Sequence, residues 1–259
     1  MDVAVLGGGP SGLAAAIALR QHGLRVALYD AQRPPIDKAC GEGLMPQSVR
    51  ILERLGVPLG DRNGGYIAGI SFHEGVEAAG GRFQDGSGVG LRRTRLHGLL
   101  AARAVEAGVR LHWGAVMQAN ADGFASAGSQ IHAGFFVIAD GLCSTLAHAT
   151  GFRQHGCTST RYAFRQPFRC APWSDMVEVH WGEREQIYVT PIGPDEVNIA
   201  LLTARRGRRL GDALADFPAV ARRLANAERT EAARGAVTKT CAMRQVVRGN
   251  VALIGDASG

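Results

Sequence analysis

Val3-Ala4-Val5-Leu6-Gly7-Gly8-Gly9-Pro10-Ser11-Gly12 opens the chain and decides its fold. The apolar run over residues 2–6 predicts a buried strand of a parallel sheet. The stretch from Ser11 to His22 is rich in alanine and leucine and is closed by Gly23, which predicts a helix. The glycines between strand and helix fit G-x-G-x-x-G in the context that a dinucleotide-binding turn requires.

In such a turn each glycine position has a physical task. Gly7 permits the tight bend, Gly9 lets the backbone approach a pyrophosphate, and Gly12 lets the helix pack against the strand. The start of the helix, with Pro10 and Ser11, offers free N–H groups and a partial positive charge to phosphates. We therefore expect these five residues to bind a dinucleotide.

The next strand supports the same reading. Leu24–Tyr29 is apolar and ends at Asp30, 18 residues beyond Gly12. A carboxylate in this place is positioned to accept hydrogen bonds from an adenosine ribose. Together these segments predict the start of a βαβ unit, and Met45–Leu55 predicts a second helix.

Composition limits the class of protein. The chain has 259 residues, 46% hydrophobic and 20% charged, which is typical of a folded globular protein. No apolar run approaches the roughly 20 residues of a membrane span, and Met1 leads straight into the first strand without a basic leader. We expect no signal peptide and a cytoplasmic protein.

The cysteines and histidines indicate neither a disulfide framework nor a metal site. The five cysteines are odd in number and widely spaced, without C-x-x-C, which fits a reducing cytoplasm. The eight histidines show neither H-x-x-x-H nor H-E-x-x-H spacing, so we expect no catalytic metal.

The net charge of +6 comes mainly from arginine. We interpret the densest cluster as a solvated face; weak association with an anionic membrane surface or with an acidic substrate is the alternative. No aromatic residues interleave with the cluster, which argues against a nucleic-acid partner. The cluster comprises Arg205, Arg206, Arg208, Arg209, Arg222 and Arg223.

The pattern of elements predicts two domains. The pattern predicts a β-ribbon over residues 66–90, a helix over residues 96–108 and a meander over residues 115–131. It predicts several strands after these, followed by a helical stretch over residues 210–234. We predict an α/β fold in which a discontinuous Rossmann-like domain of parallel sheet carries an inserted α+β domain with a sheet and helical cover. The predicted boundaries are 1–65, 91–154 and 245–259 for the first domain, and 66–90 and 155–244 for the second.

Three later segments identify the dinucleotide. They are Arg93-Thr94-Arg95-Leu96-His97-Gly98-Leu99-Leu100, Ala139-Asp140-Gly141-Leu142-Cys143-Ser144 and Val251-Ala252-Leu253-Ile254-Gly255-Asp256-Ala257. In this order they resemble motifs of the FAD-dependent oxidoreductases of the para-hydroxybenzoate hydroxylase and geranylgeranyl reductase superfamily.

The resemblance assigns a place at the cofactor to each segment. It implies Arg93 against the FAD phosphates, Asp140 and Gly141 near the pyrophosphate, and Gly255 and Asp256 at the ribityl chain. A nicotinamide dinucleotide has no ribityl chain, so the resemblance implies FAD. The family often carries an arginine where this chain has Ala147, which leans toward the reductase branch.

Lys38-Ala39-Cys40-Gly41 resembles a segment that lies near the flavin in geranylgeranyl-reductase-like members. We interpret Cys40 as a small residue packed beside the cofactor. A reactive thiolate is the alternative, and it would need Lys38 close enough to lower the thiol pKa.

The substrate side is less specific. Tyr188-Val189-Thr190-Pro191 is similar to a substrate-domain motif of these families, but the bulky aromatic residue usual in lipid reductases is missing. Glu178 and His180 alternate along a predicted strand and so share a face, either lining a substrate cavity or forming the polar side of the sheet. No catalytic acid or base is assigned.

The sequence ends at Gly259, directly after the last motif. In the family a turn and a helix come next, and this helix holds the flavin ring. We therefore expect the chain to hold the ADP half of FAD better than the isoalloxazine, and to behave as a fragment of limited stability.

The functional prediction is an FAD-dependent oxidoreductase in which NAD(P)H reduces the flavin. Reduction of a C=C bond in an isoprenoid-like or other small organic substrate is slightly favoured. A monooxygenase acting on an aromatic or polyketide substrate is the close alternative, and a catalytically inactive FAD- or ADP-binding fragment is another. The cofactor carries the chemistry in each active case and the protein orients it.

Overall fold

Strand β1 (Val3–Leu6) lies near the middle of a six-stranded sheet, and all four of its residues are buried. It pairs in parallel with the strands on both sides, as the apolar run predicts. Only β21 runs antiparallel to its neighbour. The spatial order is β21 (Val247–Arg248), β22 (Val251–Leu253), β12 (Phe135–Ile138), β1, β2 (Val26–Asp30) and β8 (Arg110–Trp113).

Successive residues of β1 point to opposite faces, and each face has its own cover. Val3 and Val5 pack on the helices, whereas Ala4 and Leu6 pack on the opposite side against a meander and a short helix. The helices are α1 (Pro10–Gln21), α2 (Pro46–Arg54) and α3 (Arg93–Glu106). The other face carries β9 (Met117–Asn120), β10 (Gly123–Ser126), β11 (Ser129–Ile131) and α4 (Thr145–Ala149).

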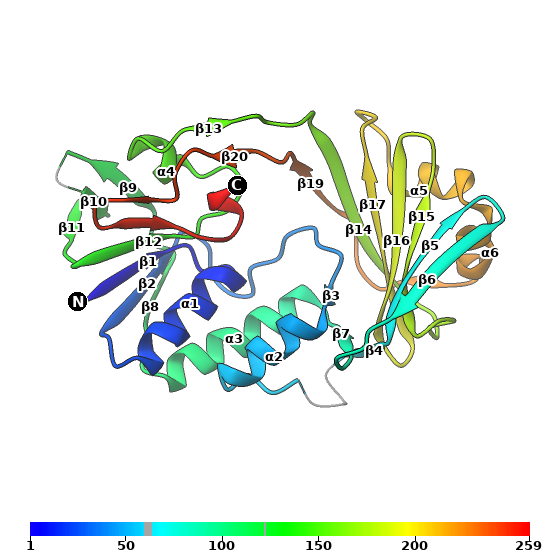
Figure 1. Cartoon of the computed structure of the whole chain (residues 1–259), viewed down its shortest axis with the longest axis horizontal. Helices are drawn as coiled ribbons and strands as arrows, with labels where there is room; N and C mark the ends of the chain where they lie inside the picture. Colours follow the sequence, from blue (N-terminus) through cyan, green and yellow to red (C-terminus); the bar gives the residue numbers. More distant parts are fainter. Residues whose placement is uncertain (60–63, 122) are drawn as a thin grey trace.

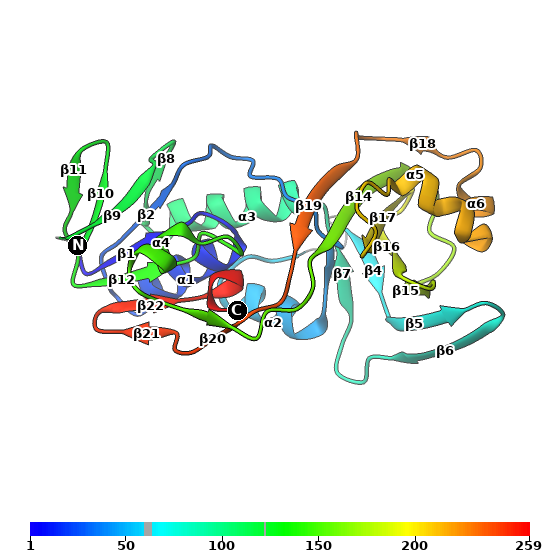
Figure 2. The ribbon, with the colours of Figure 1, turned by 90° about the horizontal axis from the view of Figure 1, so that it is seen from above.

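A second body stands beside this one and is built on an eight-stranded sheet (Figures 1 and 2). Its strands are antiparallel except for β15 and β5, which run parallel. They are β18 (Glu228–Arg229), β14 (Arg161–Arg169), β17 (Glu196–Thr203), β16 (Glu185–Gly193), β15 (Met176–Trp181), β5 (Gly69–Glu74) and β6 (Glu77–Arg82), with β19 (Arg234–Thr238) also paired to β14.

Short helices cover the face of this sheet that is turned away from the first body (Figure 1). They are α5 (Leu210–Ala213), the 3-10 turn η1 (Leu214–Asp216) and α6 (Pro218–Leu224). The prediction of one helical stretch over 210–234 is wrong in its extent. Pro218 starts a new helix because proline cannot continue the preceding one, and the chain returns to strand at Glu228.

Small sheets join the two bodies. The strands β3 (Gly43–Leu44), β7 (Gly88–Gly90) and β4 (Gly65–Ile67) form one, and β13 (Gln154–His155) pairs with β20 (Ala242–Met243) in another. The chain ends with the 3-10 turn η2 (Gly255–Ser258).

The computed structural model describes residues 1–59, 64–121 and 123–259. Residues 60–63 of the predicted first domain, and residue 122 of the predicted meander, lie outside the described residues. The α/β class with a parallel dinucleotide-binding sheet is confirmed. The predicted domain boundaries stay a prediction.

Candidate functional site

The glycine turn joins β1 to α1, and its conformation leaves no room for a side chain at Gly7 or Gly12. Gly7 has φ +122°, and a Cβ atom there would overlap the carbonyl oxygen of Ala139, the residue that follows the neighbouring strand β12. A Cβ atom on Gly12 would overlap the carbonyl oxygen of Gly7. Pro10 is the first residue of α1, and Ser11 is exposed at this helix start. The backbone is therefore bare where a pyrophosphate would approach.

Asp30 holds the turn from the end of β2. Its Oδ2 accepts a hydrogen bond from the Gly8 amide at 2.6 Å, and its Oδ1 accepts one from the Gln32 amide at 2.7 Å. Each carboxylate oxygen has more than one acceptor site, so the side chain keeps capacity for a ribose hydroxyl. The structure places Asp30 where the sequence predicts it.

His97 fixes the same turn from α3, and sequence reasoning missed it. Its side chain is fully buried, and Nε2 lies 2.9 Å from the carbonyl oxygen of Gly8. Burial lowers the pKa of His97, so the neutral ring with Nε2 protonated donates to this carbonyl. Its place one helical turn after Arg93 was the signal available in the sequence.

Arg93 begins α3 beside the glycine turn. Its guanidinium lies 3.9 Å from the position that a Cβ atom on Gly9 would take, and its amide donates to Glu42 Oε1 at 2.9 Å. Its Nε is buried and has no hydrogen-bond partner within the described part of the chain. A buried donor of this kind beside a helix N-terminus fits an anionic group of a cofactor.

Asp140 and Gly141 follow β12 at the same end of the sheet. Asp140 Oδ1 is buried and lacks a partner among the described residues, and burial raises the pKa of Asp140 despite a hydrogen bond from Ser144. Gly141 has φ +93°, and a Cβ atom there would lie 3.3 Å from Lys38 Nζ. The Asp-Gly motif and the lysine segment therefore meet.

Gly255 and Asp256 follow β22 and complete the convergence. Gly255 has φ +60°, and its Cβ position lies 2.6 Å from Ser11 Oγ at the start of α1. Asp256 is exposed and lines a central cavity between the two bodies. Four motifs that are distant in the sequence thus meet at the carboxyl ends of the parallel strands, where ligands of such sheets bind. The unpartnered atoms of Arg93 and Asp140 and the bare glycine turn fit FAD.

The segment 38–42 connects this site to the large sheet. Asn198 Nδ2 on β17 lies 3.2 Å from the carbonyl oxygen of Cys40 and 3.3 Å from that of Gly41. Glu42 is buried, and its burial raises its pKa. Cys40 and Cys143 are exposed free thiols.

The central cavity has a volume of about 530 Å³. Polar residues from the cofactor motifs form one wall, namely Lys38, Cys40, Asp140, Cys143 and Asp256. Mostly apolar residues of the large sheet form the other, including Ala163, Phe164, Tyr188, Ala200, Leu202 and Val237. A half-apolar cavity of this size beside the cofactor motifs fits a small organic substrate.

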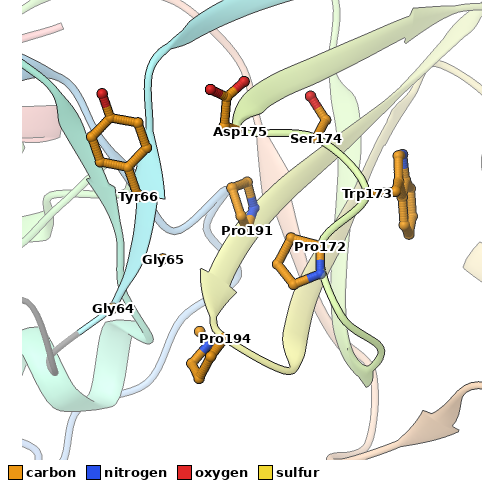
Figure 3. A pocket seen from close by; sticks show the side chains of 10 residues that line it. Gly64, Gly65, Tyr66, Pro172, Trp173, Ser174, Asp175, Pro191 and Pro194 are labelled. Carbon is orange, nitrogen blue, oxygen red and sulfur yellow. The ribbon is translucent and has the colours of Figure 1, made fainter.

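A second, outer cavity of about 740 Å³ is larger but lies elsewhere (Figure 3). Its walls come from β4 and from the loops around Pro172–Asp175 and Pro191–Pro194. None of the residues predicted to bind the cofactor lines it. We therefore assign the site to the central cavity.

Glu178 and His180 share a face, as their alternation predicts, but it is not the face of the central cavity. They pair with Val189 and Ile187, which pack on the α5 and α6 side. Their neighbour Val179 pairs with Tyr188, which lines the cavity. Because directly opposed residues of a sheet point the same way, the substrate-cavity interpretation of Glu178 and His180 is wrong.

One disulfide corrects the interpretation of the cysteines. Cys157 and Cys241 are 84 residues apart in sequence, yet they are bonded and their Cα atoms lie 4.0 Å apart. Wide spacing concealed the pair because the segments around β13 and β20 lie side by side. The spacing of the cysteines is therefore no evidence that the protein resides in a reducing compartment.

These features define an α/β dinucleotide-binding protein with a second sheet closing over the ligand site. The chain belongs to the FAD binding domain family, whose model matches residues 1–258. This confirms the resemblance to FAD-dependent oxidoreductases of the para-hydroxybenzoate hydroxylase type. No helix of the described residues is long and apolar enough to cross a membrane.

Menaquinone reductases are among the relatives that are similar to the chain. It is 31% identical over 230 residues to a menaquinone reductase of Mycolicibacterium smegmatis and 29% identical over 240 residues to one of Mycobacterium tuberculosis. In both cases the match covers 79% of this chain and 56% of the relative, so the chain spans little more than half of their length.

Solved structures share the fold. A flavoprotein/dehydrogenase from Cytophaga hutchinsonii superposes with a TM-score of 0.83 at 18% identity, covering 100% of this chain and 71% of that one. A 2-methyl-3-hydroxypyridine-5-carboxylic acid oxygenase superposes with a TM-score of 0.82 at 24% identity, covering 99% and 75%. At these identities the likeness concerns the fold.

Proposed function

We propose that the chain holds FAD along the convergent edge of the parallel sheet. The amides around Gly9, Pro10 and Ser11 and the guanidinium of Arg93 would bind the pyrophosphate. Asp30 would accept hydrogen bonds from the adenosine ribose, and Asp256 from the ribityl chain. Lys38, Cys40 and Gly41, with Asp140 and Gly141, would line the path from pyrophosphate to flavin.

We further propose that the protein is an NAD(P)H-dependent reductase of a C=C bond in a small isoprenoid-like or quinone-type substrate. The observation that carries this proposal is the central cavity, whose polar wall comes from the cofactor motifs and whose apolar wall comes from the large sheet. Bound FAD would supply hydride transfer. The similarity to menaquinone reductases supports the substrate class.

The residues of the chain itself would bind, orient and exclude water. Apolar side chains such as Leu202 and Ala163 would hold the apolar part of the substrate by removing its surface from water. The Tyr188 hydroxyl donates to Gln186 at 2.7 Å, which fixes its direction at the cavity wall. Burial raises the pKa of Tyr188, so this hydroxyl stays protonated, and its oxygen can accept a hydrogen bond from a substrate.

The first experiment is a flavin titration followed by turnover. The chain should bind FAD with a perturbed visible spectrum, and NADH or NADPH should bleach the bound flavin without oxygen. Menaquinone should then reoxidise the flavin and yield a product with one saturated C=C bond, detectable by mass spectrometry.

Other outcomes separate the alternatives. Oxygen uptake with a hydroxylated product would assign a monooxygenase instead. Retention of ADP without a perturbed flavin spectrum would assign a nucleotide-binding chain that does not catalyse the reaction, and tight binding of neither would refute the cofactor site. A small organic substrate is proposed as the ligand, with no nucleic acid as partner.

A further inference from the structure

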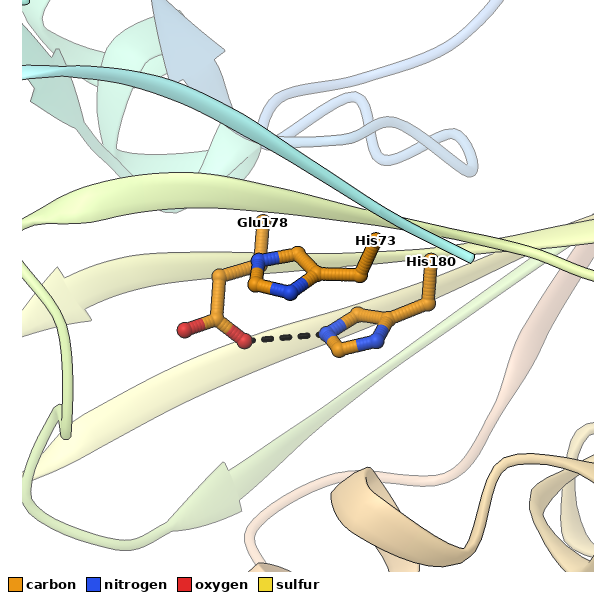
Figure 4. A group of neighbouring side chains, drawn as sticks. All are labelled: His73, Glu178 and His180. Carbon is orange, nitrogen blue, oxygen red and sulfur yellow. Dashed lines mark hydrogen bonds and ion pairs between the residues drawn. The ribbon is translucent and has the colours of Figure 1, made fainter. Parts of the chain in front are cut away.

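A group of three side chains lies on the large sheet, apart from the cofactor site (Figure 4). His73 of β5 and His180 of β15 are directly opposed in the parallel register, and Glu178 precedes His180 by two residues on the same face. This face is the one that α5 and α6 cover, opposite the central cavity. The group has no part in the proposed flavin chemistry.

The three side chains converge closely. The imidazoles of His73 and His180 stack with ring centroids 4.5 Å apart, and His180 Nε2 lies 2.9 Å from Glu178 Oε2. One ring nitrogen of each histidine and one oxygen of Glu178 all lie within 4.8 Å of one another. The side chains of His180 and Glu178 are only 12% and 11% exposed.

Neighbouring groups hold two of these side chains in place. Trp173 Nε1 donates to both oxygens of Glu178 at 3.1 Å, and Ser71 Oγ lies 2.9 Å from His73 Nε2. Such outer partners orient imidazole and carboxylate ligands at metal sites. All three ligands therefore arise from strands, and Glu178 and His73 each have a supporting hydrogen bond from outside the group.

The charge of the group is balanced only while one of the imidazoles is protonated. Within residues 1–59, 64–121 and 123–259, the only ion-pair partner of Glu178 is His180, and no arginine or lysine forms a salt bridge with it. With neutral imidazoles, the group would place one negative charge in a largely buried position. A bound divalent cation would compensate this charge and use both imidazoles as ligands.

We infer that His73, Glu178 and His180 bind one divalent metal ion of the zinc class. Two imidazoles and one carboxylate suit Zn²⁺ and neighbouring transition metals, whereas Mg²⁺ and Ca²⁺ prefer shells of oxygen. Ligand atoms must reach about 2.0–2.2 Å from the ion, which requires the side-chain torsions of the group to close around it. A water molecule would complete four-coordination.

The ion would have a structural consequence. Strand β6 is exposed along its whole length and forms the edge of the sheet, and β5 ties it to β15. Ligands on β5 and on β15 would clamp this hairpin to the body of the sheet. Metal binding should therefore stabilise the folded chain, since an ion that binds only the folded state raises its stability.

The experiment is a Zn²⁺ titration of the FAD-saturated chain by calorimetry, paired with thermal melts. We expect one Zn²⁺ per chain, a higher Tm with Zn²⁺, and at least a tenfold loss of affinity in His73→Gln and in His180→Gln. The control His132→Gln, an exposed histidine outside the group, should keep both effects. The flavin spectrum should be the same in all variants, which verifies that they fold.

Other results would overturn the inference. Absence of saturable one-to-one binding of Zn²⁺ to the natural chain would overturn it. Unchanged Zn²⁺ affinity in both histidine variants, with loss in Cys40→Ser or Cys143→Ser, would assign the ion to the thiols of the central cavity instead. Should either histidine variant fail to fold, Glu178→Gln with the same titration decides between these results.

Discussion

Gly12 packs so tightly against the glycine turn that a methyl group cannot enter. Its Cβ position overlaps the carbonyl oxygen of Gly7, which itself carries the bend. Gly98 lies in the interior of α3 with open space at its Cβ position and no left-handed φ. A side chain is therefore excluded at Gly12 and tolerated at Gly98, although both glycines lie in helices that pack together.

A pair of alanine substitutions tests this difference. Gly12→Ala should lower the free energy of unfolding by about 1–3 kcal/mol, because the added methyl group overpacks the turn and displaces backbone. The substitution should also abolish FAD binding. Gly98→Ala should raise the free energy of unfolding by about 0.5–1 kcal/mol, because alanine favours the helix. Denaturant titrations measure the free energy of unfolding, and flavin fluorescence measures FAD binding. Normal FAD affinity in Gly12→Ala would contradict the packing argument.

His97 gives stability a pH dependence. Its pKa is lowered in the folded chain by burial, so the unfolded chain binds more protons at acidic pH. The contribution of His97 is fully present above the unfolded pKa of about 6.5 and is lost as the pH falls toward the lower folded pKa. We expect the free energy of unfolding to decrease over this range.

The variant His97→Gln isolates the effect. It removes the titrating ring, so the difference in stability between natural chain and variant should shrink as the pH falls below about 6.5. Asp140 has a raised pKa and acts in the opposite direction at acidic pH, and the subtraction removes its contribution. Urea titrations at constant salt measure the free energy of unfolding of both chains at each pH. A difference in stability that is independent of pH would refute the role of His97.

Arg165 shows how a single side chain joins elements. It lies on β14, is 1% exposed, and contacts Asp37 at 2.7 Å, Glu231 at 2.9 Å and Glu42 at 3.7 Å. Asp37 and Glu42 flank the segment that carries Cys40, so this arginine attaches the segment to the large sheet. The arrangement balances buried carboxylates rather than adding stability by itself.

Arg165→Met should therefore be costly. Loss of the guanidinium leaves the buried carboxylate of Glu42 without its ion-pair partner and leaves Asp37 with Arg234 alone. We expect the free energy of unfolding to fall by about 3–5 kcal/mol. The matched control Arg169→Met removes an exposed ion pair from the same strand and should change it by less than about 1 kcal/mol. Equal effects of the two variants in denaturant titrations would contradict the buried network.

At the scale of elements, the sequence predicts what depends on local pattern. The strand, glycine turn and helix at residues 3–21 are short-range features, and each appears where the pattern indicates. Contacts between distant segments leave no such pattern. The pairing of Cys157 with Cys241, and of His73 with His180, depends on how strands are ordered in sheets. For the same reason sequence reasoning did not find Arg165, whose partners come from two other segments.

The molecule as a whole places two bodies face to face across the central cavity (Figures 1 and 2). One wall carries the cofactor motifs and the other the exposed part of the large sheet. Ala200 of β17 lies on the sheet wall, between Tyr188 and Arg165 on the neighbouring strands. A larger side chain at this position would occupy substrate space without touching the glycine turn.

Ala200→Phe should therefore separate cofactor binding from catalysis. FAD affinity should stay within about twofold, because the glycine turn lies on the opposite wall. The kcat/KM for the proposed quinone-type substrate should fall at least about tenfold, equivalent to about 1.4 kcal/mol. The control Ala219→Phe adds the same bulk to an exposed position of α6 on the far face of the sheet and should leave both unchanged. Flavin fluorescence titration and steady-state NADPH oxidation measure the two quantities. Full turnover in Ala200→Phe would move the substrate away from the central cavity, and the outer cavity beside Tyr66 would then be the site to substitute next.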